Sequence, residues 1–165
     1  MKLNRSAFTL IELLVLVVII GILTAIAVPM YENAIAKTRA IQLLSAIKSV
    51  ASAQNRYFME ANEFASDPSM LDIAYPLNSA GTQFEFHFGT CNFTHVNDSQ
   101  PHMECQMEKP HLTFHQFMKT NRLNCYSHSD DNYKADFVCQ ELTEEETPYK
   151  TADGMRHYSA GVKSE

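Results

Sequence analysis

Several residue types are scarce in this 165-residue chain, and each scarcity excludes a class of protein. Tryptophan is absent, and 5 glycines and 6 prolines are too few for a collagen-like or low-complexity chain. The 13 basic side chains are outnumbered by 19 acidic ones, which argues against a sequence-independent nucleic-acid binder, because such proteins need clustered Lys and Arg. The length suits one modest domain, or a small domain with one special segment.

The apolar residues are concentrated at one end of the chain. Residues 13–31 form a run of 19 residues without a charge, nearly all Leu, Ile, Val and Ala. As a helix, residues 8–30 would span about 35 Å, enough to cross a hydrocarbon core of about 30 Å with some tilt. Lys2 and Arg5 before the run favour a cytoplasmic N-terminus. This segment predicts a membrane-anchored or exported protein with a single head.

Glu12 is the residue that a simple membrane segment does not explain. A cleavable signal peptide would account for the basic start, the apolar run and the small residues Ala25 and Ala27, and a plain anchor would account for the hydrophobicity. Neither accounts for an acidic side chain in the run, which costs about 2.5–3.5 kcal/mol at membrane depth. An ionisable residue there is a functional candidate. A cut before Phe8 would create an α-amino group about one helical turn from this carboxylate.

The N-terminus resembles that of a type IV prepilin. Residues 2–7 form a short basic leader, Ala7 precedes the aromatic Phe8, and Glu12 is the fifth residue after that junction. The resemblance implies that a prepilin peptidase cuts between Ala7 and Phe8 and methylates the Phe8 amine. It also implies that Glu12 pairs with the Phe8 amine of an adjacent subunit during filament assembly. Ala7 departs from the family, which overwhelmingly has Gly before the cut, so slower processing is expected.

The helical pattern continues past the apolar run, so residues 31–62 are expected to form an amphipathic second half. One face is marked by residues spaced alternately by four and three positions: Ala40, Leu44, Ile47, Ala51, Gln54, Phe58 and Ala61, widened by Leu43, Val50 and Tyr57. We expect this stripe to pack on the core of the head. Pro29 removes one backbone hydrogen bond and Gly21 is a second weak point, so a helix kink is expected at these two residues.

Residues 63–165 predict a globular α+β head. Residues 82–89 alternate phenylalanine with polar residues, which is typical of one half-buried strand. Further strands are expected at residues 91–96, 102–107, 111–118 and 122–126. Together these segments predict an antiparallel meander of three or four strands that lies on the helix stripe.

Two short helices are expected in the same head. Asp67 followed by Pro68 is typical of an N-cap and the first helical position, which predicts one turn through Leu71. Residues 129–131, Ser-Asp-Asp, could cap a second helix that runs to Leu142.

All four cysteines lie in the head, and an even count in an exported domain favours disulfides. Four cysteines allow three pairings; the sequence neighbours Cys91 and Cys105, and Cys125 and Cys139, are each 14 residues apart. We expect this neighbouring pairing, in which each closed loop contributes about 3 kcal/mol in the chain-entropy model. The Cys125–Cys139 loop resembles the disulfide-bounded C-terminal loop of pilins. A zinc site is the rival, but no C-x2-C spacing is present.

The sequence carries no signature of a catalytic or cofactor site. His111 and His115 would share a face on a helix or a strand, but no H-E-x-x-H motif accompanies them, and exposed histidines on an outer sheet face are the simpler interpretation. No nucleophile elbow, P-loop or dinucleotide fingerprint is present. The chain from Phe64 onward carries 7 basic and 15 acidic side chains, a net charge of −8, so nucleic-acid binding is not expected. We expect no metal, no cofactor and no enzymatic activity.

These observations predict a type IV pilin-like fold and a structural role. The expected protein waits in the inner membrane as a single-pass precursor with its head outside the cytoplasm, and then polymerises into an extracellular homo-oligomeric pilus. Its partners would be the prepilin peptidase and the inner-membrane assembly machinery. One alternative is a pseudopilin of a type II secretion system, whose calcium site would need residues such as Asp130, Asp131 and Asp136. An alternative of another class is a signal-anchored metal-binding or enzymatic head that uses His111 and His115.

Overall fold

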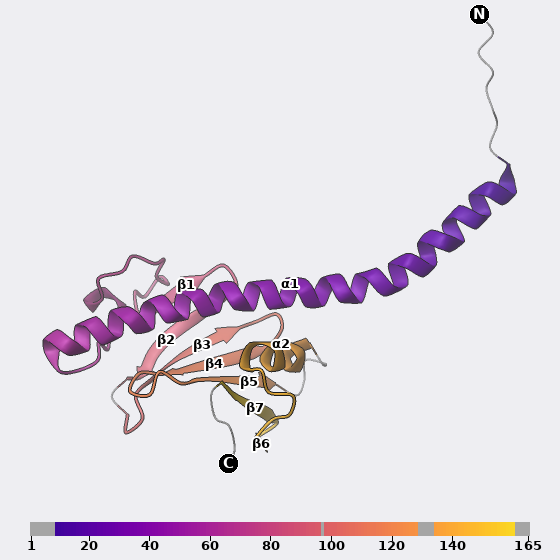
Figure 1. Ribbon diagram of the computed structural model, residues 1–165. Helices are drawn as coiled ribbons and strands as arrows, with labels where there is room; N and C mark the ends of the chain where they lie inside the picture. Colours follow the sequence, from indigo (N-terminus) through magenta and orange to yellow (C-terminus); the bar gives the residue numbers. More distant parts are fainter. Residues whose placement is uncertain (1–8, 97, 129–133, 161–165) are drawn as a thin grey trace, which may run out of the picture. The chain divides into compact units, whose positions relative to one another are not determined.

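The computed structural model describes residues 9–96, 98–128 and 134–160, and the chain divides into two units, residues 1–35 and 36–165. One long helix, α1 (Leu10–Ala61), belongs to both units (Figure 1). The remaining elements all lie in the second unit: η1 (Pro68–Met70), β1 (Gln83–Phe86), β2 (Gly89–His95), β3 (His102–Met107), β4 (Leu112–Phe117), β5 (Leu123–His128), α2 (Lys134–Thr143), β6 (Lys150–Ala152) and β7 (Met155–Ala160). This composition is the α+β class that the sequence predicts.

In the first unit, α1 is assigned as one unbroken helix through Gly21 and Pro29. Pro29 has no backbone N–H to donate, so the hydrogen bond to the residue four positions earlier is missing there. The hydroxyl of Thr24 donates to the carbonyl oxygen of Ile20 at 2.8 Å, inside the same segment. The helix kink at Gly21 and Pro29 stays a prediction.

In the second unit, the helix buries one face against the sheet and ends where the sequence indicates. Asn62 has a φ of 57°, the left-handed conformation that closes helices, and its N–H donates to the carbonyl oxygen of Phe58 at 2.9 Å. The buried residues of α1 are Ala36, Ala40, Leu43, Ile47, Val50, Ala51, Ala53 and Gln54.

The predicted stripe is right at its centre and wrong at its end. Leu43 and Val50 are fully buried, Leu44 is half-buried, and Phe58 and Ala61 are exposed. A stripe with a mean spacing of 3.5 residues drifts around a helix of 3.6 residues per turn, so its last members leave the core face. The side-chain amide of buried Gln54 holds the segment that follows α1 against the helix. It donates to the carbonyl oxygen of Ala65 at 2.8 Å and accepts from the N–H of Ala65 at 2.9 Å.

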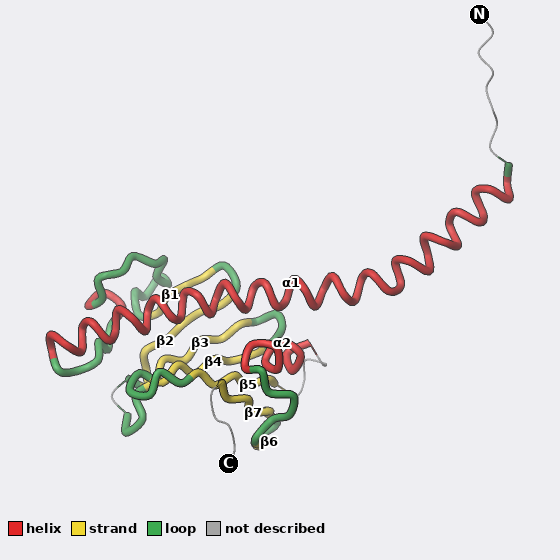
Figure 2. Tube along the Cα trace, viewed as in Figure 1, coloured by secondary structure: helices red, strands yellow, loops and turns green. Residues whose placement is uncertain are grey.

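The strands form one antiparallel sheet of seven in the order β1-β2-β3-β4-β5-β7-β6 (Figure 2). The predicted meander of three or four strands corresponds to β2 to β5, and β6 and β7 were not predicted. The single strand expected over residues 82–89 is wrong. His87 and Phe88 form a turn between β1 and β2, and Phe86 pairs with Gly89 across it. The alternation of phenylalanines therefore continues through the turn, and in that part of the sequence it does not indicate a strand.

The two faces of the sheet differ. The inner face carries Cys91, Cys105, Phe114, Cys125 and Tyr158, all at most 1% exposed, and it packs against α1 and α2. The opposite, outer face carries His102, His115, Tyr126 and His157, and no described helix covers it.

Gly89, at the start of β2, has no room for a side chain. A Cβ atom at this position would lie 2.1 Å from the carbonyl oxygen of Gln106 and 3.3 Å from Cδ2 of Leu43. The first distance is far inside van der Waals contact, and a backbone carbonyl cannot rotate away as a side chain can. Only glycine fits at the start of β2.

Candidate functional site

The start of α1 is closed by a capping box. The Thr9 hydroxyl accepts a hydrogen bond from the Glu12 N–H at 3.3 Å, and the Glu12 carboxylate accepts from the Thr9 N–H and the Thr9 hydroxyl, both at 3.0 Å. This is the reciprocal arrangement of the S/T-x-x-E motif, in which two of the otherwise unpaired N–H groups of a helix start are satisfied. The sequence carries this motif as Thr-Leu-Ile-Glu over residues 9–12, and the cap was not predicted from it.

Glu12 is thus the first charged residue of the described chain and already has a role within its own helix. Ala7 and Phe8, the expected cleavage and methylation positions, lie outside the described residues. Their roles, and the pairing of Glu12 with the Phe8 amine, stay predictions.

The helix surface after this cap is apolar and uncovered. Every described side chain from Thr9 to Glu32 is exposed, from 89% at Leu10 to about half at Ile19 and Ile20. α1 contains a stretch long and apolar enough to cross a membrane, although a signal sequence or the buried core helix of a soluble protein also passes that test. The exposure excludes a core helix within this chain. An apolar surface of this extent marks contact with lipid or with other proteins.

Two disulfides fasten the head. Cys91 and Cys105 are directly opposite each other on β2 and β3, with Cα atoms 4.1 Å apart. Cys125 of β5 is joined to Cys139 of α2, with Cα atoms 5.6 Å apart. The second disulfide therefore fixes α2 on the inner face of the sheet.

Asp136 reinforces the same contact between α2 and the sheet. Its carboxylate accepts hydrogen bonds from the hydroxyls of Ser127 and, at 3.1 Å, Tyr158, and it forms an ion pair with Arg156. Burial raises the pKa of the Tyr158 hydroxyl. Asp130 and Asp131, the other two residues considered for calcium, lie outside the described residues. Asp136 is therefore used to hold α2 in place, with a cationic partner already present.

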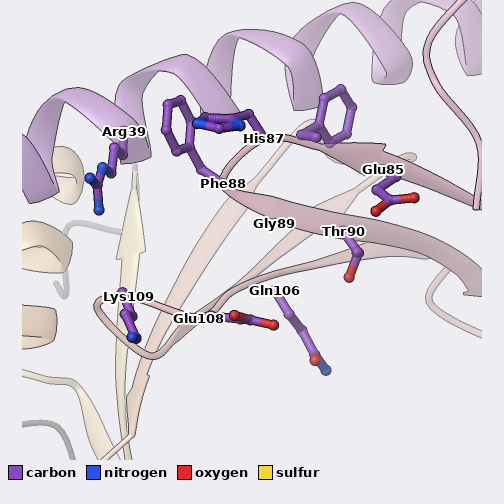
Figure 3. Close-up of a pocket in the computed structure, with 10 residues that line it drawn as sticks. Arg39, Glu85, His87, Phe88, Gly89, Thr90, Gln106, Glu108 and Lys109 are labelled. Carbon is purple, nitrogen blue, oxygen red and sulfur yellow. The ribbon is translucent and has the colours of Figure 1, made fainter.

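A cleft of about 420 Å³ lies between α1, the β1–β2 turn and the β3–β4 turn (Figure 3). On the helix side the Arg39 guanidinium lies 5.6 Å from the centre of the Phe88 ring. On the other side are Glu108 and Lys109, with Gly89 between the two sides (Figure 3). The lining residues carry both signs of charge and include no cysteine, serine or tyrosine nucleophile. The cleft has no arrangement of a nucleophile with a general base.

The histidines lie mainly on the outer face and form two pairs that the sequence spacing did not indicate. His111 and His115 do not stack on each other; each stacks on a histidine of the neighbouring strand. The rings of His111 and His128 have centroids 4.1 Å apart, and those of His115 and His102 have centroids 4.7 Å apart. Their partners come from β5 and β3, which only the strand register reveals. Among the residues that the structure describes, no three His, Cys, Asp or Glu side chains form a ready metal cluster.

The outer face is aromatic beyond these pairs. The ring centroids of His115 and Tyr126 are 4.4 Å apart, and those of Tyr126 and His157 are 4.7 Å apart. Rings from β4, β5 and β7 therefore form a continuous row. The pKa of His157 is lowered, first because burial disfavours the charged ring and second because Lys150 is close.

The N-terminal part of the chain is similar to known proteins. Residues 2–28 match the family described as the prokaryotic N-terminal methylation motif. The chain is 36% identical over 73 residues to a fimbrial protein of Pseudomonas aeruginosa, covering 44% of this chain and 47% of that protein. It is 40% identical over 63 residues to the type IV major fimbrial protein FimA of Dichelobacter nodosus, covering 38% of this chain and 40% of that protein.

Another relative is the type IV major pilin protein PilE1 of Neisseria gonorrhoeae, 28% identical over 72 residues, which is 44% of each chain. The chain thus spans somewhat less than half the length of these curated relatives. No solved structure matches the chain significantly. The methylation motif, the fimbrial relatives and the long apolar helix with its antiparallel sheet agree, and the resemblance of this chain to type IV pilins is confirmed.

Proposed function

We propose that this chain is the precursor of a type IV pilus subunit that is cut between Ala7 and Phe8 and then polymerises. The observation that supports this most is the apolar surface of residues 10–31, which no described part of the chain covers and most of which lies within the N-terminal methylation motif. In the membrane this surface contacts lipid. In a filament it contacts the same surface of other subunits, so the transfer exchanges one apolar environment for another.

Cleavage creates the second element of assembly. The new α-amino group of Phe8 is a cation beside the Thr9–Glu12 cap, and the Glu12 carboxylate of an adjacent subunit is its counter-ion. A carboxylate surrounded by apolar helices is stable only with such a partner, and removing one partner of a buried pair costs about 3–5 kcal/mol. The pair therefore sets the axial register. A repeated head-to-tail contact that does not close on itself produces an open fibre.

The location and the remaining partners follow from this proposal. Lys2 and Arg5 hold the leader on the cytoplasmic side, and α1 crosses the inner membrane once with the head outside. The prepilin peptidase and the inner-membrane assembly machinery act on the precursor there, and the assembled pilus is extracellular.

The first experiment identifies the N-terminus. Mass spectrometry of N-terminal peptides would be made on the membrane fraction and on filaments sheared from the cell surface. A chain that begins at methylated Phe8 in the sheared fraction is the expected result. A chain that begins at Met1 and stays in membranes would contradict the proposal, and a processed chain retained in the envelope would favour the short fibre of a pseudopilin. A chain that begins at Val28 would be a secreted head.

The second experiment separates the two roles of Glu12. Glu12→Gln keeps an oxygen that can accept from the Thr9 N–H but removes the charge, whereas Glu12→Ala removes both. Thr9→Val removes the hydroxyl of the cap and keeps the charge. We expect both Glu12 variants to insert in the membrane and to lose most surface filaments, with Thr9→Val close to wild type. If Glu12→Gln assembles normally and Glu12→Ala does not, the role of Glu12 is to cap the helix and the register pair is wrong.

A further inference from the structure

We propose that the cleft between α1, the β1–β2 turn and the β3–β4 turn binds the headgroup of a phospholipid that carries both a phosphate and a primary amine. The inference rests on the proposed function, because it requires a precursor whose apolar segment is inserted in a bilayer. The phosphate lies against Arg39 and Lys109. The amine lies against Glu85 and Glu108. The contact belongs to the precursor in the membrane and does not involve filament assembly.

The cleft holds charges of both signs that do not neutralise one another. Its volume is about 420 Å³, and two cationic and two anionic side chains line it: Arg39, Lys109, Glu85 and Glu108. Among the residues that the structure describes, none of these four side chains forms an ion pair. Figure 3 shows Arg39 and Lys109 toward one end of the cleft and Glu85 toward the other. Opposite charges that are held apart in one cleft favour a ligand that carries both charges over a simple anion.

Arg39 is the side chain best prepared to bind the phosphate. Its guanidinium lies 5.6 Å from the centre of the Phe88 ring, a cation–π contact that uses the face of the guanidinium and none of its N–H donors. The His87 ring packs against Phe88 in turn, with ring centroids 4.6 Å apart. A planar guanidinium binds two phosphate oxygens at once, whereas Lys109 adds a point charge at the same end of the cleft.

The acidic side chains of the cleft select the amine. Glu85 of β1 and Glu108 of the β3–β4 turn are both exposed, so an ammonium group reaches them from solvent. A primary ammonium has three N–H donors, and each forms a charge-assisted hydrogen bond with a carboxylate oxygen. A choline headgroup has no N–H donor and is recognised by aromatic rings instead. The cleft therefore favours a primary amine over choline.

The cleft is at the end of the head where the chain arrives from the apolar segment. Arg39 lies in the first helical turn of the second unit, which begins at Ala36. Tyr31 ends the apolar run and is 67% exposed, and tyrosine at such a position lies at the level of the lipid headgroups. The chain from Tyr31 to Arg39 rises about 12 Å as a helix, and a helical side chain leans back toward the helix N-terminus. Insertion of the apolar segment therefore keeps headgroups at a high local concentration beside the cleft.

The test uses the full unprocessed chain in detergent, with phosphatidylethanolamine as the probe. Native mass spectrometry counts the lipids that stay bound to each chain and separates monomers from dimers. Wild type should retain one phosphatidylethanolamine per chain, in preference to phosphatidylglycerol, which has no amine, and to phosphatidylcholine, whose amine has no N–H. Arg39→Gln should weaken retention about tenfold, because it removes a charge-assisted contact with the phosphate. Glu108→Gln should reduce the preference over phosphatidylglycerol.

Matched variants separate the cleft from lipid that coats the apolar helix. Lys119→Gln removes one positive charge at an exposed turn outside the cleft and should retain the lipid like wild type. Arg39→Lys keeps the cation and should retain more lipid than Arg39→Gln, with unchanged circular dichroism spectra. The inference is overturned if Arg39→Gln retains lipid like wild type, if Lys119→Gln loses as much, or if phosphatidylglycerol is retained equally well. A lipid-free dimer that is lost in Arg39→Gln would also overturn it, because a second copy would then occupy the cleft.

The source of the headgroup and the proposed function are tested separately. Free phosphoethanolamine at millimolar concentration should leave the lipid bound; its displacement would identify a soluble ligand and overturn the inference. If sheared filaments contain methylated Phe8 and the precursor retains no lipid, only the lipid site is wrong. If the chain keeps Met1 and stays in membranes but retains the lipid through Arg39, the pilus proposal is wrong and the lipid site stands.

Discussion

Ile19 and Ile47 are the same residue in the same helix, and their surroundings are opposite. Ile19 is 50% exposed, whereas Ile47 is 0% exposed beneath the sheet. The same contrast separates the two units: no side chain from Thr9 to Glu32 is buried, and the helix from Ala36 onward contributes eight residues to the buried part of the head. The first unit leaves its apolar side chains exposed, and the second unit buries its own in a core.

The contrast teaches which part of the sequence reports function. In the first unit no described side chain is buried, and the methylation motif of residues 2–28 is visible in the sequence. In the second unit most residues are selected for packing, which many sequences satisfy equally well. The head therefore reveals its fold and little of its role.

The largest expected effect tests this contrast with one pair of substitutions. Ile47→Ala should lower the free energy of unfolding of the head by about 2–5 kcal/mol, because it leaves a cavity in a fully buried site. Ile19→Ala should leave it unchanged, because that side chain is 50% exposed and belongs to the first unit. Urea unfolding of the full chain in detergent, followed by tyrosine circular dichroism, measures both. An equal decrease of the free energy of unfolding in the two variants would contradict this contrast between the two units.

A pair of glycines gives the next contrast. Gly89→Ala places a Cβ 2.1 Å from the backbone carbonyl oxygen of Gln106, so the β2–β3 contact must shift, at a cost of about 1–3 kcal/mol. Gly21→Ala meets nothing within 4 Å and should strengthen the helix by about 1 kcal/mol. Thermal unfolding of the head and helix content by circular dichroism report the two effects. A stable Gly89→Ala head would mean that the strands separate there without cost.

How far the sequence predicts this molecule depends on the range of the contacts involved. β3 was predicted with its exact bounds, and β4 and β5 to within two residues, because local alternation and flanking turns determine them. The cap of η1 was also predicted, since Asp67 accepts from the Ser69 N–H at 2.8 Å. Each of these features depends on a few consecutive residues.

The errors arise where a pattern continues across a turn or where a strand needs a distant partner. The alternation through Phe84, Phe86 and Phe88 conceals the turn at residues 87–88. β7 pairs with β5, although α2 and β6 lie between these two strands in the sequence. β6 has only three residues, too few for a periodic signal. Local residue patterns carry no information on such pairing.

The candidate sites divide in the same way. Glu12 stands out in the sequence because it is charged within an apolar run, and its capping partner Thr9 is three residues away. The His102–His115 and His111–His128 pairs are invisible, because their members come from different strands and meet only through the register. The spacing of His111 and His115 indicates a shared face and nothing about the partners of either ring.

The third prediction concerns how the head keeps α2. Asp136→Asn should lower the free energy of unfolding by about 1–3 kcal/mol, because the carboxylate that receives Ser127, Tyr158 and Arg156 loses its charge. The Arg156 side chain is 41% exposed, which keeps the ionic part of the effect small. A double-mutant cycle with Arg156→Met measures that part. Strict additivity of the two substitutions would show that Asp136 acts through its hydroxyl contacts and not through the ion pair.

The smallest effect contrasts the charges of the two units. Glu12 is the one charged side chain within residues 9–31, whereas in the head half of α1 Lys37 and Arg56 form ion pairs on the surface. Arg56 donates two hydrogen bonds to the Asp72 carboxylate, at 2.9 and 2.7 Å. This contact lowers the pKa of Asp72, so the pair stabilises the folded head above about pH 4 and the contribution is lost as the pH falls below that value.

Both side chains are at least half exposed, so salt screens the pair, and its effect on the melting temperature should be small. Asp72→Asn should melt slightly below wild type at pH 7 in low salt, and the difference should shrink as the pH falls below about 4 and the carboxylate is protonated. Asp153→Asn, the same change at an exposed turn, controls for net charge. A difference that does not shrink as the pH falls would mean that Asp72 acts through packing rather than through its charge, and the contrast with Glu12, whose role is proposed to depend on its charge, would then be sharper.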